Sequence, residues 1–178
     1  DIHLGAGVTV NGKRNSLEDF YHDKELVEFI DYYSSDLYGN REVELIINGD
    51  LFDLLAVPFV PFFDDEYWCE DASLEKLKLI LDAHQEVIKA LVNFSGKKNK
   101  KIVYILGNHD AELIFESLRQ HLISLFPEKN KENFKILFEV DGEYCPHPQV
   151  VVKHGHDYEI ANDFHPEDSF FLGEDGKR

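Results

Sequence analysis

Apolar runs that end abruptly at a short polar motif are the feature that most restricts the fold of this chain. The runs cover residues 43–48, 101–106 and 149–153, and each has the length and the Val, Ile and Leu content of a buried β-strand. They lead into Gly49-Asp50-Leu51-Phe52-Asp53, Gly107-Asn108-His109-Asp110 and His154-Gly155-His156. Residues just beyond the carboxyl ends of several strands converge on one site in an open α/β sheet. The pattern therefore predicts a shared polar site at one edge of a sheet.

A fourth polar block, Asp1-Ile2-His3, opens the chain. Asp1 and His3 are separated by one residue, so in an extended chain their side chains project to the same side and can bind one ion together. With the other blocks they offer carboxylate, imidazole and amide oxygen, a donor set that suits divalent metals. We therefore expect a metal centre whose ligands come from segments far apart in the sequence.

Helices and strands are expected to alternate between these motifs. Ser16 and Asp19 predict a helix start, with Leu26, Val27, Ile30 and Tyr33 on one face. Helical spacing predicts a second helix over 74–91, stopped by Gly96, and a third over 111–126, ended by Pro127. Alternation over 134–140, followed by the Asp141-Gly142 turn signal, predicts a strand and a hairpin. This order is typical of a mostly parallel sheet that passes into a more antiparallel one.

The four blocks in this order resemble the calcineurin-like metallophosphoesterase superfamily, which has Asp-x-His, Gly-Asp-x-x-Asp, Gly-Asn-His-Asp and a later His-Gly. One Gly-Asp pair is a common turn signal, but the conjunction is specific and spans nearly the whole chain. The resemblance implies an α/β (α+β) fold, a four-layer αββα sandwich, with residues 1–178 as a single domain. It also implies a hydrolase that cleaves a phosphomonoester, phosphodiester or pyrophosphate bond. The attacking group would be a hydroxide held by two divalent transition-metal ions, with Mn, Fe, Zn or Ni as the candidates.

The resemblance also assigns roles to the metal ligands. Asp50 would bridge the two ions, Asp1 and His3 would bind one of them, and Asn108 and His154 would bind the other.

Four further residues receive roles outside the ligand set. His109 would stabilise or protonate the leaving oxygen and would not bind metal, and Asp110 would hold the orientation of its ring. Asp53 is interpreted either as a partner of a metal-binding histidine or as a helix-capping carboxylate. His156 faces the substrate or bonds its own loop.

Two features depart from the superfamily pattern. A Gly-His-x-His block, which would give each ion a further histidine, does not follow His154-Gly155-His156 before Arg178. The strand expected ahead of Asp1 is also not present in the sequence. The resemblance therefore implies an excerpt of a longer protein, with a sandwich incomplete at both ends.

The charge balance separates the alternative functions. The 18 basic and 35 acidic residues give a formal charge of −17, which opposes a nonspecific electrostatic grip on DNA or RNA and disfavours a nuclease. The second alternative, a non-catalytic protein-binding scaffold, gives no reason to keep Asp50, Asn108 and His109 together. The longest apolar runs fall far short of the roughly 18 residues of a membrane span, and no secretory segment is visible. We therefore expect a cytoplasmic protein without a transmembrane segment that acts on a small-molecule phosphate ester, and the oligomeric state stays open.

Overall fold

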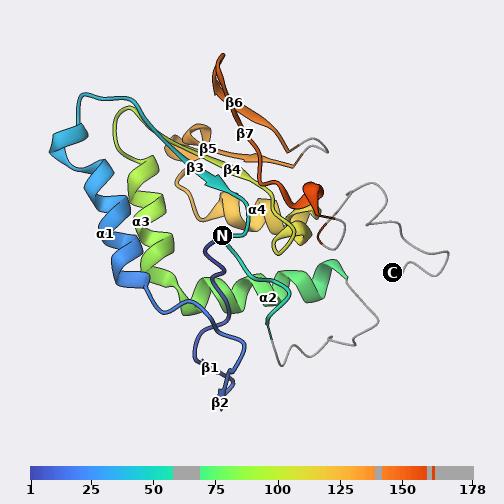
Figure 1. The fold of residues 1–178 in the computed structure, drawn as a ribbon. Helices are drawn as coiled ribbons and strands as arrows, with labels where there is room; N and C mark the ends of the chain where they lie inside the picture. The colour runs from blue at the N-terminus through green and yellow to red at the C-terminus, as the bar shows by residue number, and fades with distance from the viewer. Residues whose placement is uncertain (58–68, 139–141, 160–161, 163–178) are drawn as a thin grey trace.

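A three-stranded parallel sheet organises the part of the chain that the structure describes. The computed structural model describes residues 1–57, 69–138, 142–159 and 162 (Figure 1). The sheet has the order β3-β4-β5, formed by Val43–Asn48, Lys100–Ile105 and Phe134–Leu137. Two antiparallel hairpins join β1 (Thr9–Val10) to β2 (Lys13–Arg14) and β6 (Tyr144–His147) to β7 (Val150–Val152). The fold is therefore mixed α/β, with both parallel and antiparallel sheets, as predicted.

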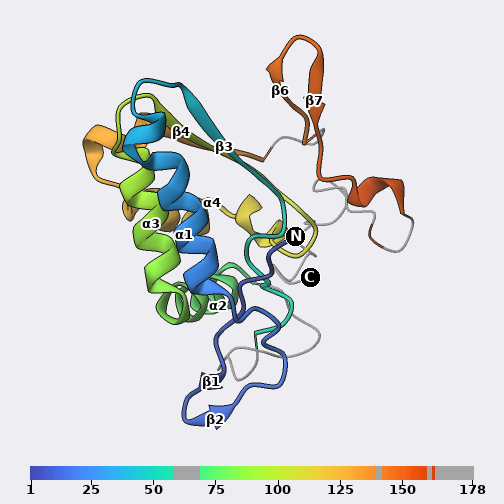
Figure 2. The ribbon, with the colours of Figure 1, turned by 60° about the vertical axis from the view of Figure 1, so that its left-hand side comes forward.

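Helices cover the sheet on the side away from the β6–β7 hairpin (Figure 2). The α-helices among the described residues are α1 (Asp23–Ser34), α2 (Glu70–Ala83), α3 (Gln85–Ser95) and α4 (Glu116–Ser124). Short 3₁₀ turns follow α1, β4, α4 and β7, respectively: η1 (Asp36–Tyr38), η2 (Ala111–Ile114), η3 (Glu128–Asn133) and η4 (His156–Tyr158). Helix α1 packs against α3, and α3 packs against β4. Every helix in this part of the chain is too short or too polar to cross a lipid bilayer.

The predicted strands agree well with the structure. The run at 43–48 is β3 without change, the run at 101–106 is β4 shifted by one residue, and the run at 149–153 contains β7. The predicted strand over 134–140 ends as β5 at Leu137, and residues 139–141, with half of the predicted turn, lie outside the described part. Strand β4 is the central strand and is almost entirely buried, and β3 beside it is half-buried, so both strands stand out in the sequence as mostly apolar runs.

The predicted helices are present, but their bounds differ from the prediction and two of them are interrupted. Helix α1 begins at Asp23 rather than at Ser16. The predicted helix over 74–91 is two helices, α2 and α3, separated at His84, which is 4% exposed and has φ −114° and ψ 37°. The predicted helix over 111–126 is η2 followed by α4, because Phe115 is extended at ψ 132°.

The register of the sheet brings the polar motifs to one edge. Asn48, the last residue of β3, pairs with Ile105, the last residue of β4, so both strands end at the same level. Strand β4 forms the core of the sheet, and Ile102 and Ile105 are at most 1% exposed. The chain segments that follow β3 and β4, which carry Asp50 and Asn108, therefore leave the sheet side by side.

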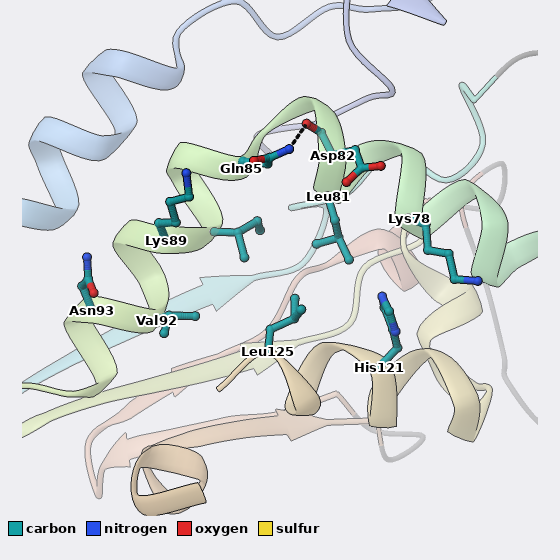
Figure 3. Close-up of a pocket in the computed structure, with 10 residues that line it drawn as sticks. Lys78, Leu81, Asp82, Gln85, Lys89, Val92, Asn93, His121 and Leu125 are labelled. Atoms are coloured by element: carbon teal, nitrogen blue, oxygen red, sulfur yellow. Dashed lines mark hydrogen bonds between the residues drawn. The ribbon is translucent and has the colours of Figure 1, made fainter. Parts of the chain in front are cut away.

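A surface hollow of about 730 Å³ lies between α2, α3 and α4 (Figure 3). Leu81, Ile88, Val92 and Leu125 line its apolar part, and polar side chains such as Lys78, Lys89 and His121 surround it. The lining comes from the helical layer, so this hollow is separate from the edge of the sheet at which the motifs meet.

Candidate metal centre

The N-terminal segment lies beside the second polar motif. The His3 amide donates to the Asp50 carbonyl at 2.9 Å, and Leu4 forms a parallel bridge with Phe52. His3 has a φ of 57°, so the backbone is left-handed there rather than extended. The expectation that Asp1 and His3 project together from an extended chain is therefore wrong, although both side chains reach Asp50.

Asp50 has a left-handed backbone conformation at the tight turn that follows β3. Its φ is 49°, and that of Gly49 is 77°; Asp is among the few residues other than Gly that visit this region. A Cβ on Gly107 would lie 2.1 Å from Asp50 Oδ1, and a Cβ on Gly49 would lie 2.3 Å from His154 Nδ1. Because Gly49 and Gly107 have no side chains, the Asp50 carboxylate and the His154 ring can approach each other.

The carboxylate of Asp50 belongs to two groups of potential ligands. One group is Asp1, Asp50 and His154, and the other is His3, Asp50 and His109. Within each group the ligand atoms all lie within 4.8 Å of one another. Asp50 Oδ2 is 3.7 Å from His3 Nε2 and 3.3 Å from His154 Nε2. Asp50 is thus the shared member, the position expected of a bridging carboxylate.

Hydrogen bonds hold Asp50 in its charged form. The residue is 3% exposed, and its Oδ1 accepts from the His109 amide at 3.0 Å. Burial alone would raise the pKa of Asp50, but the contact with His154 and the His109 amide outweigh burial and lower it. The contact with Asp50 in turn raises the pKa of His154, against the effect of burial.

His154 presents one ring nitrogen to the site. Its Nδ1 is 2.6 Å from the Asn48 carbonyl, which can only accept, so Nδ1 carries the proton. Its Nε2 is 3.3 Å from both Asn108 Oδ1 and Asp50 Oδ2. The predicted set of Asp50, Asn108 and His154 is therefore brought together. The His156 ring, in η4, has its centroid 5.3 Å from that of His154.

Asp53 connects two histidines. Its Oδ1 lies 3.0 Å from His109 Nδ1, and its Oδ2 lies 3.3 Å from His3 Nδ1. The Ala56 amide also donates to Oδ1 at 3.1 Å. Asp53 thus contacts the two imidazoles, as its interpretation as a histidine partner expects. It also closes a local turn, but none of the described residues directly after it begins a helix, so it does not act as a helix cap. The rings of His3 and His109 are edge to face with their centroids 4.4 Å apart.

Asp110 has a different place from the one expected. It is fully buried, and its carboxylate accepts from the Leu51 amide at 3.0 Å, the Gly107 amide at 2.6 Å and the Tyr104 hydroxyl at 2.6 Å. Burial raises its pKa to about 6 although these bonds oppose the rise. The carboxylate against the His109 ring belongs to Asp53, and Asp110 instead ties the second motif to the third.

The donors at the strand ends suit divalent metal ions. Three imidazoles, an amide oxygen and carboxylates converge, and such mixed nitrogen and oxygen sets bind Mn, Fe, Zn or Ni. The bond from Asn48 to His154 and the bonds from Asp53 to His3 and His109 are of the kind that orients histidines in metal sites. Each of the two groups that share Asp50 could therefore hold a metal ion.

Two contributors at this site carried little sequence signal. The Asn48 carbonyl orients His154, and the Tyr104 hydroxyl bonds Asp110. Both residues lie in apolar runs, where a backbone acceptor or a single phenol does not stand out. The one signal in the sequence is Tyr104, whose hydroxyl needs a hydrogen-bond partner near the end of a buried strand.

The chain matches no protein-family model, no curated protein and no solved structure. Function is therefore inferred from the chemistry of the site.

Proposed function

We propose that this chain is a metal-dependent phosphoesterase of the calcineurin-like type. The observation that carries the proposal is the position of Asp50, whose buried carboxylate is common to two ligand groups at the carboxyl ends of parallel strands. Two divalent ions bound there would polarise a phosphoryl oxygen, lower the pKa of water and clamp the oxygens of an in-line displacement. We further propose that the β6–β7 hairpin belongs to the second sheet of an αββα sandwich.

The residues of the chain divide the remaining work. Asp50, Asn108 and His154 would hold one ion, and Asp50 and His3 would hold the other. Asp1, which the resemblance assigns to the His3 ion, lies instead in the group with Asp50 and His154. His109 would donate a proton to the leaving oxygen from Nε2, since Asp53 fixes its Nδ1 at 3.0 Å. The group formed by His3, Asp50 and His109 gives His109 a second possible role as a ligand.

The defining experiment measures hydrolysis of bis(4-nitrophenyl) phosphate and 4-nitrophenyl phosphate with chelator and then with added Mn²⁺. We expect turnover that requires metal and a protein that holds about two ions, as the two ligand groups imply. Asp50→Asn should lose both, whereas Asp31→Asn, an exposed change on α1, should lose neither. A folded protein that neither binds Mn²⁺, Fe²⁺, Zn²⁺ or Ni²⁺ nor hydrolyses either ester would contradict the proposal. That result would favour a non-catalytic protein-binding scaffold.

The role of His109 is tested by His109→Ala. We expect turnover to fall by roughly 10²- to 10⁴-fold, the usual range for a positioned acid, with little change in metal content. If metal content and rate fall in proportion, His109 is a ligand.

A further inference from the structure

A buried carboxylate lies behind the N-terminal ligands. The Glu18 side chain is 0% exposed and belongs to the loop between β2 and α1, outside every polar motif. A carboxylate is rarely buried without several donors, because loss of water disfavours its charge. The donors around Glu18 therefore indicate what it holds.

The donors come mainly from the segment that follows His3. Glu18 Oε1 accepts from the Gly5 amide at 3.3 Å and from the Phe20 amide at 3.2 Å, and Oε2 accepts from the Gly7 amide. Gly5 is two residues from His3. One carboxylate thus fixes the backbone directly after the N-terminal ligands.

A histidine supports Glu18 from the other side. His84, at the junction of α2 and α3, has Nε2 at 3.7 Å from Glu18 Oε1 and Nδ1 at 2.7 Å from Asp23 Oδ1. His84 is 4% exposed, and its ring is held by the Nδ1 contact with Asp23, whose side chain is partly exposed at the start of α1. The 3.7 Å between Nε2 and Glu18 is a close approach that is longer than a hydrogen bond. His84 thus approaches Glu18 from the point at which the predicted long helix is interrupted.

The glycines of the segment fit closely around these groups. A Cβ on Gly5 would lie 2.6 Å from Glu18 Oε2, and a Cβ on Gly7 would lie 2.9 Å from the Cβ of Ala83. Gly7 also has a φ of 80°. The segment therefore follows the surface formed by Glu18 and the end of α2, with no room for a side chain at either position.

We propose that Glu18 is a positioning residue for the metal centre, acting through the Gly5 and Gly7 amides to place Asp1 and His3 against Asp50. The close approach of His84 to Glu18 connects the α2–α3 junction to this segment. The link to metal rests on the proposed function, while the effect on the backbone of the segment does not.

Glu18→Gln is the sharpest variant, because it keeps the shape of the side chain and replaces one acceptor oxygen with an NH₂ donor. That NH₂ group would face an amide that also donates, so the segment should detach on that side. Glu18→Asp keeps both oxygens and should retain part of the effect. His84→Gln should weaken the segment in the same direction, by less, because it acts through Glu18.

Lys100→Met is the matched control. Lys100 is also buried, and its Nζ donates to the carbonyls of Tyr38 and Arg41 at 2.8 and 3.0 Å. It begins β4, at the opposite end of the strand from Gly107. This variant should destabilise the fold without moving the ligands, so it separates a local effect from general loss of stability.

The metal-free readout is amide hydrogen exchange by NMR in chelator. The His3 and Leu4 amides, which donate to the carbonyls of Asp50 and Leu51, should exchange at least about tenfold faster in Glu18→Gln relative to the amides of β4. In Lys100→Met all these amides should change together. Unchanged relative exchange of His3 and Leu4 in Glu18→Gln would overturn the proposal, whether or not the protein binds metal.

The second readout is Mn²⁺ affinity of the folded protein, measured by titration calorimetry well below the unfolding midpoint. Outer contacts of metal ligands are worth about 10- to 100-fold in affinity, and we expect the lower end for Glu18→Gln, which acts through the backbone. Lys100→Met should keep wild-type affinity. If wild-type protein binds Mn²⁺ and Glu18→Gln binds it equally well, Glu18 serves only the fold. If wild-type protein does not bind, the proposed function fails while the exchange data still decide the positioning role.

Discussion

At the scale of single residues, the arrangement around His109 depends on which carboxylate touches its ring. Asp53 contacts both His109 and His3, while Asp110 is occupied by Tyr104 and two amides. Sequence order alone favours the neighbouring Asp110 as the partner of His109. In the turn after β4 the His109 and Asp110 side chains contact different partners, and the His109 ring meets Asp53 instead. The sequence does not show the directions of these two side chains.

The first prediction concerns Asp53→Asn. Loss of the charged acceptor should let both imidazoles turn, so we expect metal affinity and turnover to fall by about 10- to 100-fold. Calorimetry with Mn²⁺ and the ester assay measure the two effects. Asp19→Asn, an exposed change in the loop before α1, is the control. Wild-type metal affinity and turnover in Asp53→Asn would show that Asp53 serves only to close the turn to Ala56.

The second prediction concerns Glu112, which is fully buried and has Oε1 3.6 Å from Lys76 Nζ. Burial raises its pKa from 4.5 to about 7, although Lys76 opposes the rise. A carboxyl whose pKa is raised by folding stabilises the protein below its unfolded pKa, and that contribution is lost as pH rises to the folded pKa. Stability should therefore fall between about pH 4.5 and pH 7, at up to roughly 1.4 kcal/mol per pH unit from this group.

Urea unfolding in chelator at several pH values measures this slope. Glu112→Gln should flatten it, while Asp110, whose pKa is raised to about 6 in the same direction, should leave a remainder. An unchanged slope in Glu112→Gln would show that Glu112 stays charged through its contact with Lys76.

At the scale of elements, the strands were predicted more closely than the helices. Residues 43–48 and 101–106 are mostly apolar because β4 is the buried central strand and β3, which is half-buried, pairs along its whole length with β4. The ends of these strands place the candidate ligands. The helical spacing over 74–91 is also real, since Leu77, Leu81, Val87 and Leu91 are buried. It does not reveal the interruption at His84, because the pairing of that residue with Asp23 and Glu18 is a long-range contact.

The third prediction concerns the turn that follows β4. Gly107→Ala would place a Cβ 2.1 Å from Asp50 Oδ1 and 2.7 Å from the Asp50 amide nitrogen. The strand ends must separate, so we expect loss of Mn²⁺ binding and destabilisation by roughly 1–3 kcal/mol, the usual cost of overpacking. Gly12→Ala is the matched control, since its Cβ meets open space and only its φ of 75° is unfavourable. Full metal binding by Gly107→Ala would contradict the close approach.

At the scale of the whole molecule, the candidate ligands join distant parts of the chain. They come from the N-terminal segment, the segments that follow β3 and β4, and the segment after β7 that carries His154. Bound metal would therefore tie the β6–β7 hairpin to the parallel sheet. The sequence predicted this convergence from strand ends, but it could not predict how β7 is oriented relative to β3, because the bond from Asn48 to His154 joins residues 106 positions apart.

The fourth prediction follows from this convergence. Because the ligands are brought together by folding, Mn²⁺ should raise the thermal unfolding midpoint, and an excess of 100 times the dissociation constant should add about 2.7 kcal/mol per ion. Asp50→Asn should show little rise. Calorimetric scans over a range of Mn²⁺ concentrations measure it, and equal rises in both proteins would place the binding elsewhere.

The left-handed backbone at Asp50 has an evolutionary consequence. A side chain with a Cβ is disfavoured at a φ of 49°, and glycine would relieve that strain. A lineage selected for foldability alone would therefore drift toward glycine at this position and would lose the carboxylate. Retention of aspartate at position 50 would therefore mark homologues that are still under selection for the chemistry of the site. Homologues with glycine there would have lost that chemistry.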